Sequence, residues 1–349
     1  MSATLTADPA RGVDPGRPDP RARIGRHRAL VAEALDRVVP AGRAPEGLYA
    51  PMRFVLEGEG KRLRPVLVLL AAEACGARAE DALPAALAAE VFHNFTLVHD
   101  DIMDHAATRR GRPTVHVRWD EPTAILAGDL LMGEAYRLLA ETPRGDLRAL
   151  FAAFATMVTR LCEGQALDKQ FETEPAVSVE RYLDMIDRKT GALLEHCLEA
   201  GALVAGAPDA HADALRAAGH AAGRAFQIMD DLLDLVADDV RWGKTVGGDL
   251  VEGKKAFLLL RALEASNAAG DAATGDAAFF GRIASERGLA PALVPDARAR
   301  MERLGVLDDA RAAIAAYTDD ALAHLHALPP TEARDALVWL VRDLSGRLH

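Results

Sequence analysis

From about residue 26 to the C-terminus, apolar residues recur at spacings of three and four in an alanine- and leucine-rich sequence. This spacing places apolar side chains on one face of a helix. We find no convincing run in which apolar and polar residues alternate, so the pattern predicts an all-α fold. Helices are expected near 26–38, 44–57, 65–75, 82–105, 121–141, 146–171, 179–205, 211–237, 254–266, 277–287, 295–326 and 330–346.

The first residues do not follow this pattern. Residues 1–24 carry Pro9, Pro15, Pro18 and Pro20 among arginine, aspartate and glycine, and they offer little apolar surface to offset the entropy of ordering. We expect a disordered leader over 1–24 and a single all-helical domain over 25–349. The stretch from Ala268 to Ala277 is expected to be a surface loop.

Composition limits the possible classes of function. The chain has 349 residues, half of them apolar, and its net charge of −11 with few aromatic residues argues against a nucleic-acid-binding surface. Cys75, Cys162 and Cys197 form no C-x-x-C pair. The sequence lacks an apolar run of roughly 20 residues and the apolar core of a signal peptide. We therefore expect a reduced, cytoplasmic protein with no integral membrane segment.

Two acidic motifs interrupt the apolar helices. The first consists of Asp100, Asp101 and Asp104, and the second of Asp230, Asp231 and Asp234. In both motifs the pattern is D-D-h-h-D, where h is apolar. On a helix the three carboxylates share an arc of about 100°, and the two apolar residues point elsewhere. Each motif can therefore present carboxylates on one face and pack into a core with the other.

Clustered aspartates need a compensating positive charge, because like charges at this spacing destabilise a helix by roughly 0.2–0.5 kcal/mol per pair. Magnesium prefers such oxygen ligands and often shares its coordination sphere between carboxylates and substrate phosphates. Basic clusters lie near the motifs in sequence: Lys61, Arg62 and Arg64; Arg109, Arg110 and Arg112; and Lys244, Lys254 and Lys255. Any one cluster alone is typical of a solvated helix end. Together they indicate a diphosphate bound between metal and cationic side chains.

At these residues the chain resembles a known family. The segments GKRLRP, HNFTLVHDDIMD, RRGRPT, AGDLL, KTGAL, FQIMDDLLD and GKTVGGDLVEGK occur in the order found in trans-isoprenyl diphosphate synthases of the polyprenyl synthetase family. The chain is most similar to the short-chain geranylgeranyl and farnesyl diphosphate synthases. The resemblance implies the isoprenoid synthase fold, a helical bundle around a deep central cavity, usually as a homodimer.

The resemblance also implies a role for each matching residue. The implied metal ligands, for about three Mg²⁺ ions, are Asp100, Asp104 and Asp230. The implied catalytic set comprises Asp100, Asp101, Asp104, Asp230, Asp231, Asp234, Lys189 and Lys244. The implied contacts to the allylic diphosphate are Arg109, Lys189, Thr190, Gln227, Lys244 and Lys254. The implied contacts to isopentenyl diphosphate are Lys61, Arg64, His93 and Arg110.

The expected reaction condenses isopentenyl diphosphate with C5, C10 or C15 allylic diphosphates. Breaking the allylic C1–O bond leaves a cation and pyrophosphate, whose developing charge metal ions and cationic side chains stabilise. The double bond of isopentenyl diphosphate then attacks the cation, and the departing pyrophosphate accepts the final proton. This chemistry requires no covalent nucleophile on the protein.

The resemblance implies that a residue below the first motif, on the same helix, limits product length. Phe95 lies five residues before Asp100, about 7.5 Å down a helix axis, and Thr96 follows it. The bulky ring and the absence of a two-residue insertion in the motif favour a C20 geranylgeranyl product, with C15 farnesyl as the alternative. Phe92 and Val91, one turn further, are the other candidates for this limit.

Rival interpretations rest on fewer residues. Glu90 and His93 form an E-x-x-H pair, as in di-iron carboxylate bundles, but a second pair is missing. His99 with Asp100 suggests an HD-type phosphohydrolase, which leaves the repeated aspartate motif unexplained. A class I terpene cyclase would not need the second motif, and an inactive regulatory subunit would have lost motif residues. We expect His99 to be a helix-packing or hydrogen-bonding residue, and Glu90 to support His93 or a nearby arginine.

Overall fold

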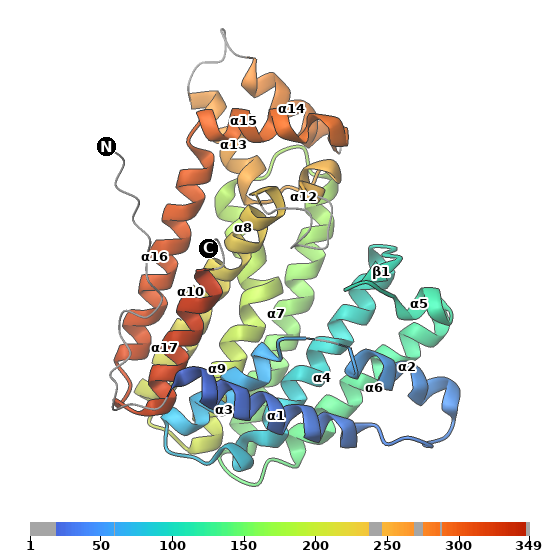
Figure 1. Ribbon diagram of the computed structural model, residues 1–349, viewed down its shortest axis with the longest axis vertical. Coiled ribbons are helices and arrows are strands. Elements are labelled where there is room, and N and C mark those ends of the chain that lie inside the picture. The colour runs from blue at the N-terminus through green and yellow to red at the C-terminus, as the bar shows by residue number, and fades with distance from the viewer. Residues whose placement is uncertain (1–18, 59, 237–245, 269–274, 287, 347–349) are drawn as a thin grey trace.

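The computed structural model describes residues 19–58, 60–236, 246–268, 275–286 and 288–346, and most of them are helical (Figure 1). The prediction of an all-α fold is confirmed. The one sheet in this part of the chain is a hairpin of two two-residue strands, β1 (Thr108–Arg109) and β2 (Arg112–Pro113). Its register pairs Thr108 with Pro113.

The first half of the chain contains α1 (Pro20–Val38), α2 (Glu46–Leu56), α3 (Leu63–Ala74), α4 (Ala79–Met103), α5 (Val115–Arg118), α6 (Glu121–Ala140) and α7 (Leu147–Thr173). The second half contains α8 (Val179–Ile186), a π-helical turn η1 (Asp187–Gly191), α9 (Ala192–Ala205), α10 (Asp209–Val236), α12 (Gly248–Val251), α13 (Phe257–Ala268), α14 (Asp276–Glu286), η2 (Pro291–Leu293), α15 (Val294–Arg303), α16 (Val306–His326) and α17 (Glu332–Ser345).

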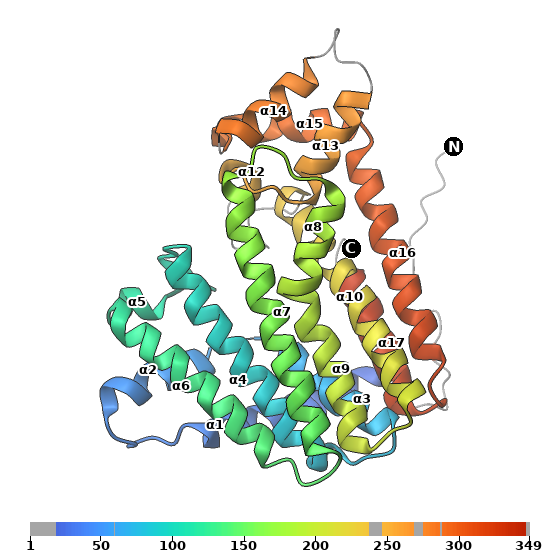
Figure 2. The same cartoon turned by 180° about the vertical axis from the view of Figure 1, so that it is seen from behind.

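Long helices run along the molecule, and shorter ones cover its two ends. Figures 1 and 2 show α13, α14 and α15 at one end and α1 with α3 at the other. The core at the α1 end contains the buried side chains of Leu69, Phe92 and Phe154. The core at the α14 end contains Leu259 and Phe280. Helix α10 contributes to both cores and so connects the two ends.

Three of the differences from the expected helix boundaries have a clear structural cause or consequence. Helix α1 begins at Pro20, because Asp19 caps it by accepting a bond from the amide of Arg21 at 2.9 Å. The helix expected over 295–326 breaks where Gly305 adopts a φ of 76°. The helix expected over 179–205 contains the π-helical turn at 187–191. Residues 1–18 and 269–274 lie outside the described residues, so the predicted leader and loop stay predictions there.

Within the described segments, no helix is both long and apolar enough to cross a bilayer. Helix α3 is the most continuously apolar, and its residues from Pro65 to Ala72 are all buried. An all-round apolar helix of this length is typical of the centre of a large core.

Candidate active site

The first aspartate motif lies at the C-terminal end of α4. Asp101 is buried, whereas Asp104 caps the helix and is exposed. Asp101 accepts a bond from Nε of Arg109 at 2.7 Å. Asp101 is therefore occupied in holding the following hairpin, and Asp100 and Asp104 are the members with more accessible carboxylates.

Two lysines approach the first motif from elsewhere in the chain. Lys169 on α7 donates to Asp104 at 3.0 Å. Desolvation raises the pKa of Asp100, and the positive charge of Lys189 opposes this rise. Sequence reasoning missed Lys169, because nothing in the local sequence around it marks a contact with a residue 65 positions away.

The second aspartate motif lies at the C-terminal end of α10. Asp231 is buried and accepts bonds from the hydroxyl of Tyr182, from Nε2 of Gln227 at 3.0 Å and from the amide of Phe257 at 3.1 Å. Asp234 accepts from the amide of Asp249 at 3.1 Å. Asp230 is partly exposed. As in the first motif, the middle aspartate is buried and hydrogen-bonded to the surrounding fold.

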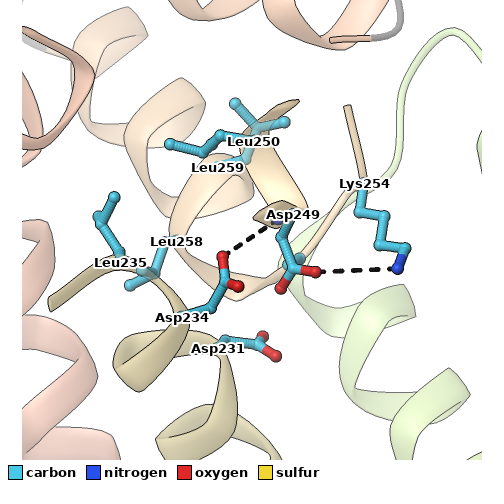
Figure 3. Close-up of a pocket in the computed structure, with 9 residues that line it drawn as sticks. Asp231, Asp234, Leu235, Asp249, Leu250, Lys254, Leu258 and Leu259 are labelled. Carbon is cyan, nitrogen blue, oxygen red and sulfur yellow. Dashed lines mark hydrogen bonds and ion pairs between the residues drawn. The ribbon is translucent and has the colours of Figure 1, made fainter. Parts of the chain in front are cut away.

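A further carboxylate, that of Asp249, joins the second motif, and sequence reasoning missed it. Figure 3 shows Asp231, Asp234 and Asp249 around one small cavity of about 10 Å³, with Lys254 beside them. Desolvation raises the pKa of Asp249 to about 7, and the charges of Asp231 and Asp234 add to the rise. The aspartate in the segment GGDLVEGK is the signal for this carboxylate, but the sequence pattern predicts a ligand role only for the basic residues there.

Asp249→Asn is expected to stabilise the metal-free protein in a pH-dependent way. The pKa of Asp249 is about 7 in the folded chain and about 3.9 in an unfolded one, so the folded state holds its proton more tightly. Ionisation then costs folding free energy that grows as pH rises from about 4 to about 7. Calorimetry in the presence of a chelator should show a gain in Tm of at least about 3 °C at pH 8, shrinking towards zero at pH 4. A gain equal at both pH values would contradict this account.

The π-helical turn η1 places two of the predicted residues between the motifs. Lys189 donates to Asp168 on α7 at 2.5 Å. Thr190 donates to Oε1 of Gln227 at 3.0 Å, and Gln227 in turn donates to Asp231. Thr190 and Gln227 are thus joined in one chain of hydrogen bonds that ends at the second motif.

Arginines surround His93 on α4. Nη1 of Arg64 lies 3.0 Å from Nε2 of His93. Desolvation lowers the pKa of His93 well below its usual range, and positive charges lower it further. These charges belong to Arg64, Arg110, Arg109 and Arg62. A neutral histidine among several guanidinium groups is suited to an anionic ligand.

Arg62 has a different task from its neighbours. It pairs with Glu90 at 2.7 Å and donates to the carbonyls of Leu56 and Gly58 at 2.7 and 2.8 Å. The expectation that Glu90 supports a nearby arginine is confirmed. Because Glu90 pairs with Arg62 and His93 with Arg64, the two residues do not act together as di-iron ligands.

The hairpin carries the next two arginines. Arg110 and Gly111 form its turn with φ angles of 52° and 73°. Arg112 is engaged elsewhere than the arginines around His93. Its guanidinium covers the ring of Phe54 at 3.9 Å, and Arg118 lies over the same ring at 4.4 Å. This cation–π contact holds the base of the hairpin against α2. Arg112 therefore positions the hairpin.

The lysines after the second motif differ from one another. Lys254 is exposed and pairs with Glu252 at 2.8 Å, with Asp249 at 3.9 Å. Lys255 is buried and donates to the carbonyl of Phe171 at 2.6 Å, so its task is structural. Lys244 lies outside the described residues, and Lys61 is exposed next to Arg62.

Charges on the two motifs act across the space between them. Desolvation lowers the pKa of Lys254, but Glu252 and Asp249 raise it overall, and Asp104 of the first motif adds to the rise. Desolvation likewise lowers the pKa of Arg64, and Asp230 of the second motif opposes this effect. Asp104 of the first motif therefore influences the pKa of Lys254, and Asp230 of the second motif influences that of Arg64.

Phe95 lies below the first motif among other rings. Its centroid is 4.7 Å from that of His99 and 5.3 Å from that of Phe92. Phe92 is fully buried against Phe154 at 5.3 Å. Thr96 donates its hydroxyl to the carbonyl of His93. Phe95 is partly exposed and Phe92 is not, so Phe95 is the better placed of the two to meet a substrate chain.

His99 packs between α4 and α6, as expected. A Cβ atom added to Gly128 would lie 2.3 Å from Nε2 of His99. The glycine of the AGDLL segment therefore leaves room for the ring of His99 against α6. Oδ1 of Asp129 lies 3.8 Å from Nε2 of His99. No group of three or more potential metal ligands is gathered there in the described part of the chain, so the structure adds no support to the HD-type interpretation.

The donor set fits magnesium. Among the described residues, no group of three or more histidine, cysteine, aspartate or glutamate side chains is already gathered as a metal site. Magnesium does not need one, because it keeps several waters and takes one or two carboxylates together with phosphate oxygens. Asp100, Asp104 and Asp230 supply only oxygen ligands, the kind that magnesium prefers.

Comparison with known proteins identifies the family. The family model described as polyprenyl synthetase matches residues 45–277. A geranylgeranyl diphosphate synthase of Methanosarcina mazei is 44% identical over 67% of this chain and 72% of its own. A geranylgeranyl pyrophosphate synthase of Geoglobus acetivorans is 37% identical over 92% of this chain and 97% of its own.

The fold has solved relatives. The crystal structure of a geranylgeranyl pyrophosphate synthetase from Pyrococcus horikoshii superposes with a TM-score of 0.85 at 35% identity, covering 93% of this chain and 98% of that one. The expected isoprenoid synthase fold is confirmed. With its two aspartate motifs and their accompanying cations, the chain belongs to the polyprenyl synthetase family of prenyltransferases.

Proposed function

We propose that the protein is a short-chain trans-prenyltransferase that condenses isopentenyl diphosphate with C5, C10 and C15 allylic diphosphates and makes geranylgeranyl diphosphate. One observation carries this proposal. Each aspartate motif ends a long helix beside a lysine: Lys169 lies 3.0 Å from Asp104, and Lys254 lies 3.9 Å from Asp249, which joins the second motif. Such an alternation of charge is suited to diphosphates held between acidic and basic groups.

In this proposal the aspartates hold magnesium and the cations hold phosphate. Asp100, Asp104 and Asp230 would bind about three ions, which supply positive charge to the departing pyrophosphate. Arg109, Lys189, Lys244 and Lys254 bind the allylic diphosphate, with Thr190 and Gln227 beside it. Asp101, Asp231 and Asp234 hold the surrounding loops, as their bonds to Arg109, Phe257 and Asp249 indicate.

Isopentenyl diphosphate is assigned to the arginine-rich side, with Lys61, Arg64, His93 and Arg110 as its ligands. The buried Nε of Arg64 has no hydrogen-bond partner in the described part of the chain, and an anionic ligand would satisfy it. A neutral His93 can accept from Arg64 and donate to phosphate through its other nitrogen. The departing pyrophosphate takes the proton released when the new double bond forms.

Product length is assigned to Phe95. Its ring lies among those of His99 and Phe92, about one and a half helical turns below Asp100. A growing chain that extends down α4 meets this ring before it meets Phe92. This placement supports a C20 limit and makes C15 the alternative product.

Pyrophosphate release tests the proposal against a terpene cyclase. Purified protein is incubated with Mg²⁺ and farnesyl diphosphate, with and without isopentenyl diphosphate. We expect release only when both substrates are present, because ionisation is productive only with the acceptor bound. Release from the allylic substrate alone would indicate a cyclase, and no release under either condition would support an inactive subunit.

We further propose a cytoplasmic homodimer built from one domain, which begins with α1 at Pro20 and not at the predicted residue 25, because Ile24 is already part of the buried core. Helix α10 lies in both cores, which supports a single domain.

Ile125 and Leu126 on α6 are 40% and 59% exposed, an apolar surface that a second copy would cover. The three cysteines are unpaired, as in reducing compartments. Light scattering should give twice the chain mass of 37.2 kDa.

A further inference from the structure

The π-helical turn η1 interrupts an otherwise continuous helix formed by α8 and α9. It contains Lys189 and Thr190, whose side chains reach Asp168 and Gln227. A π-helical turn has poorer backbone geometry than an α-helix and is frequently found at functional sites. Some contact in the surrounding structure must therefore stabilise it.

An ion pair ties the start of the turn to α10. Arg224 donates to both carboxylate oxygens of Asp187, from Nε at 2.8 Å and from Nη2 at 2.6 Å. Nη1 of Arg224 reaches the hydroxyl of Tyr317 on α16 at 3.3 Å. Asp187 is buried, and the two parallel hydrogen bonds fix the orientation of its side chain. Arg224 lies one helical turn before Gln227, so the same face of α10 contacts the turn twice.

A second group ties the turn to α7. Nη2 of Arg160 donates to the backbone carbonyl of Asp187 at 3.3 Å and to Oε1 of Glu195 at 3.1 Å. Glu195, four residues beyond the end of the turn, also lies 2.9 Å from Nδ1 of His220 on α10. Both ends of the turn are thus held by charged groups from the two neighbouring helices.

Two glycines allow the neighbouring backbones to close on the turn. A Cβ atom at Gly164 on α7 would lie 2.2 Å from the backbone nitrogen of Lys189. A Cβ atom at Gly223 on α10 would lie 2.8 Å from Cα of Gly191. The turn therefore fits only because both positions lack side chains, and its backbone has little room to move.

We propose that Arg224 is a positioning residue that, through its bidentate pair with Asp187, fixes the π-helical turn and so aims Lys189 and Thr190 at the allylic diphosphate. This inference rests on the proposed function for its substrate, but the contacts that carry it are independent of that function. A misplacement of about 1 Å at such a group can cost on the order of 100-fold in rate. The pair therefore acts on catalysis through geometry, without touching substrate.

Substitution at Arg224 is expected to lower kcat and to leave the binding of isopentenyl diphosphate unchanged. Arg224→Ala should lose at least about tenfold in kcat, with the KM for isopentenyl diphosphate within twofold of wild type, because that substrate is assigned to Arg64 and His93. Arg224→Lys keeps the charge but not the two parallel bonds, and it should recover part of the lost kcat. Arg216 on α10 offers a control, because it also pairs with a carboxylate of a neighbouring helix away from the turn: its Nε and Nη2 both donate to Oε1 of Glu199 on α9.

The experiment combines kinetics with amide hydrogen exchange. Arg224→Ala should raise exchange at residues 187–191 by at least about fivefold, and Arg216→Ala should not. If Arg224→Ala does not fold, Arg224→Lys carries both measurements. Unchanged exchange at 187–191, or a kcat within twofold of wild type in an active enzyme, would overturn the positioning role. A wild-type protein without prenyl transfer would refute the proposed function instead, while the exchange measurement would still test the contact.

Discussion

Asp100→Ala is expected to lower kcat by about 1,000-fold, the size of effect seen when a group that stabilises developing charge is removed. Asp100 is a partly exposed carboxylate of the first motif and lies under the influence of Lys189. In the proposed assignment its removal takes away one magnesium ligand. Steady-state kinetics at saturating Mg²⁺ and both diphosphates measure the change, and Asp230→Ala should behave alike.

Asp308→Ala is the control for this experiment. Asp308 is an aspartate on α16 with a side chain 85% exposed, and it pairs with Arg311 one helical turn away. Its removal changes the net charge equally but leaves both motifs intact, so kcat should stay within twofold. If Asp100→Ala or Asp230→Ala left the rate within threefold of wild type, the metal-binding role of the motifs would be wrong.

Phe95→Ala is expected to change the main product completely, from C20 to C25 or longer. Removing the ring opens space beside His99 and above Phe92, and each added isoprene unit needs only a further few ångströms of depth. Because Phe95 is partly exposed and Phe92 fully buried, the substitution should cost less stability than the roughly 3–5 kcal/mol of a buried phenylalanine. Reversed-phase chromatography of the dephosphorylated products gives the chain length.

A phenylalanine in the other core provides the comparison. Phe279 lies on α14, and Phe279→Ala removes a ring that packs against Phe280 in the core at that end. It should lower Tm without altering the product distribution. Unchanged products from Phe95→Ala would mean that another residue limits the chain, and Phe92→Ala would then be the next variant to size.

Local sequence was sufficient for the helices and the two motifs. Three- and four-residue periodicity directly reflects one buried helical face, so most helix positions were predicted. The D-D-h-h-D pattern is equally local, because all its members lie within two turns. Its buried middle aspartates, Asp101 and Asp231, were predicted as members of the site but without their hydrogen-bond partners.

The rest of the site depends on contacts between distant segments. Lys169 meets Asp104 across 65 residues, and Arg224 meets Asp187 across 37. The π-helical turn packs closely against its neighbours because Gly164 and Gly223 lack side chains, a contact between distant segments that no local propensity encodes. Arg112 and Lys255 looked like ligands by composition, but they lie against Phe54 and Phe171.

The most direct test of the central claim is the size of the product. The protein is incubated with Mg²⁺, isopentenyl diphosphate and, in separate reactions, dimethylallyl, geranyl or farnesyl diphosphate, and the products are sized by chromatography. We predict geranylgeranyl diphosphate from all three primers, with pyrophosphate released for each unit added. Pyrophosphate release without any prenyl product longer than the primer would contradict the account.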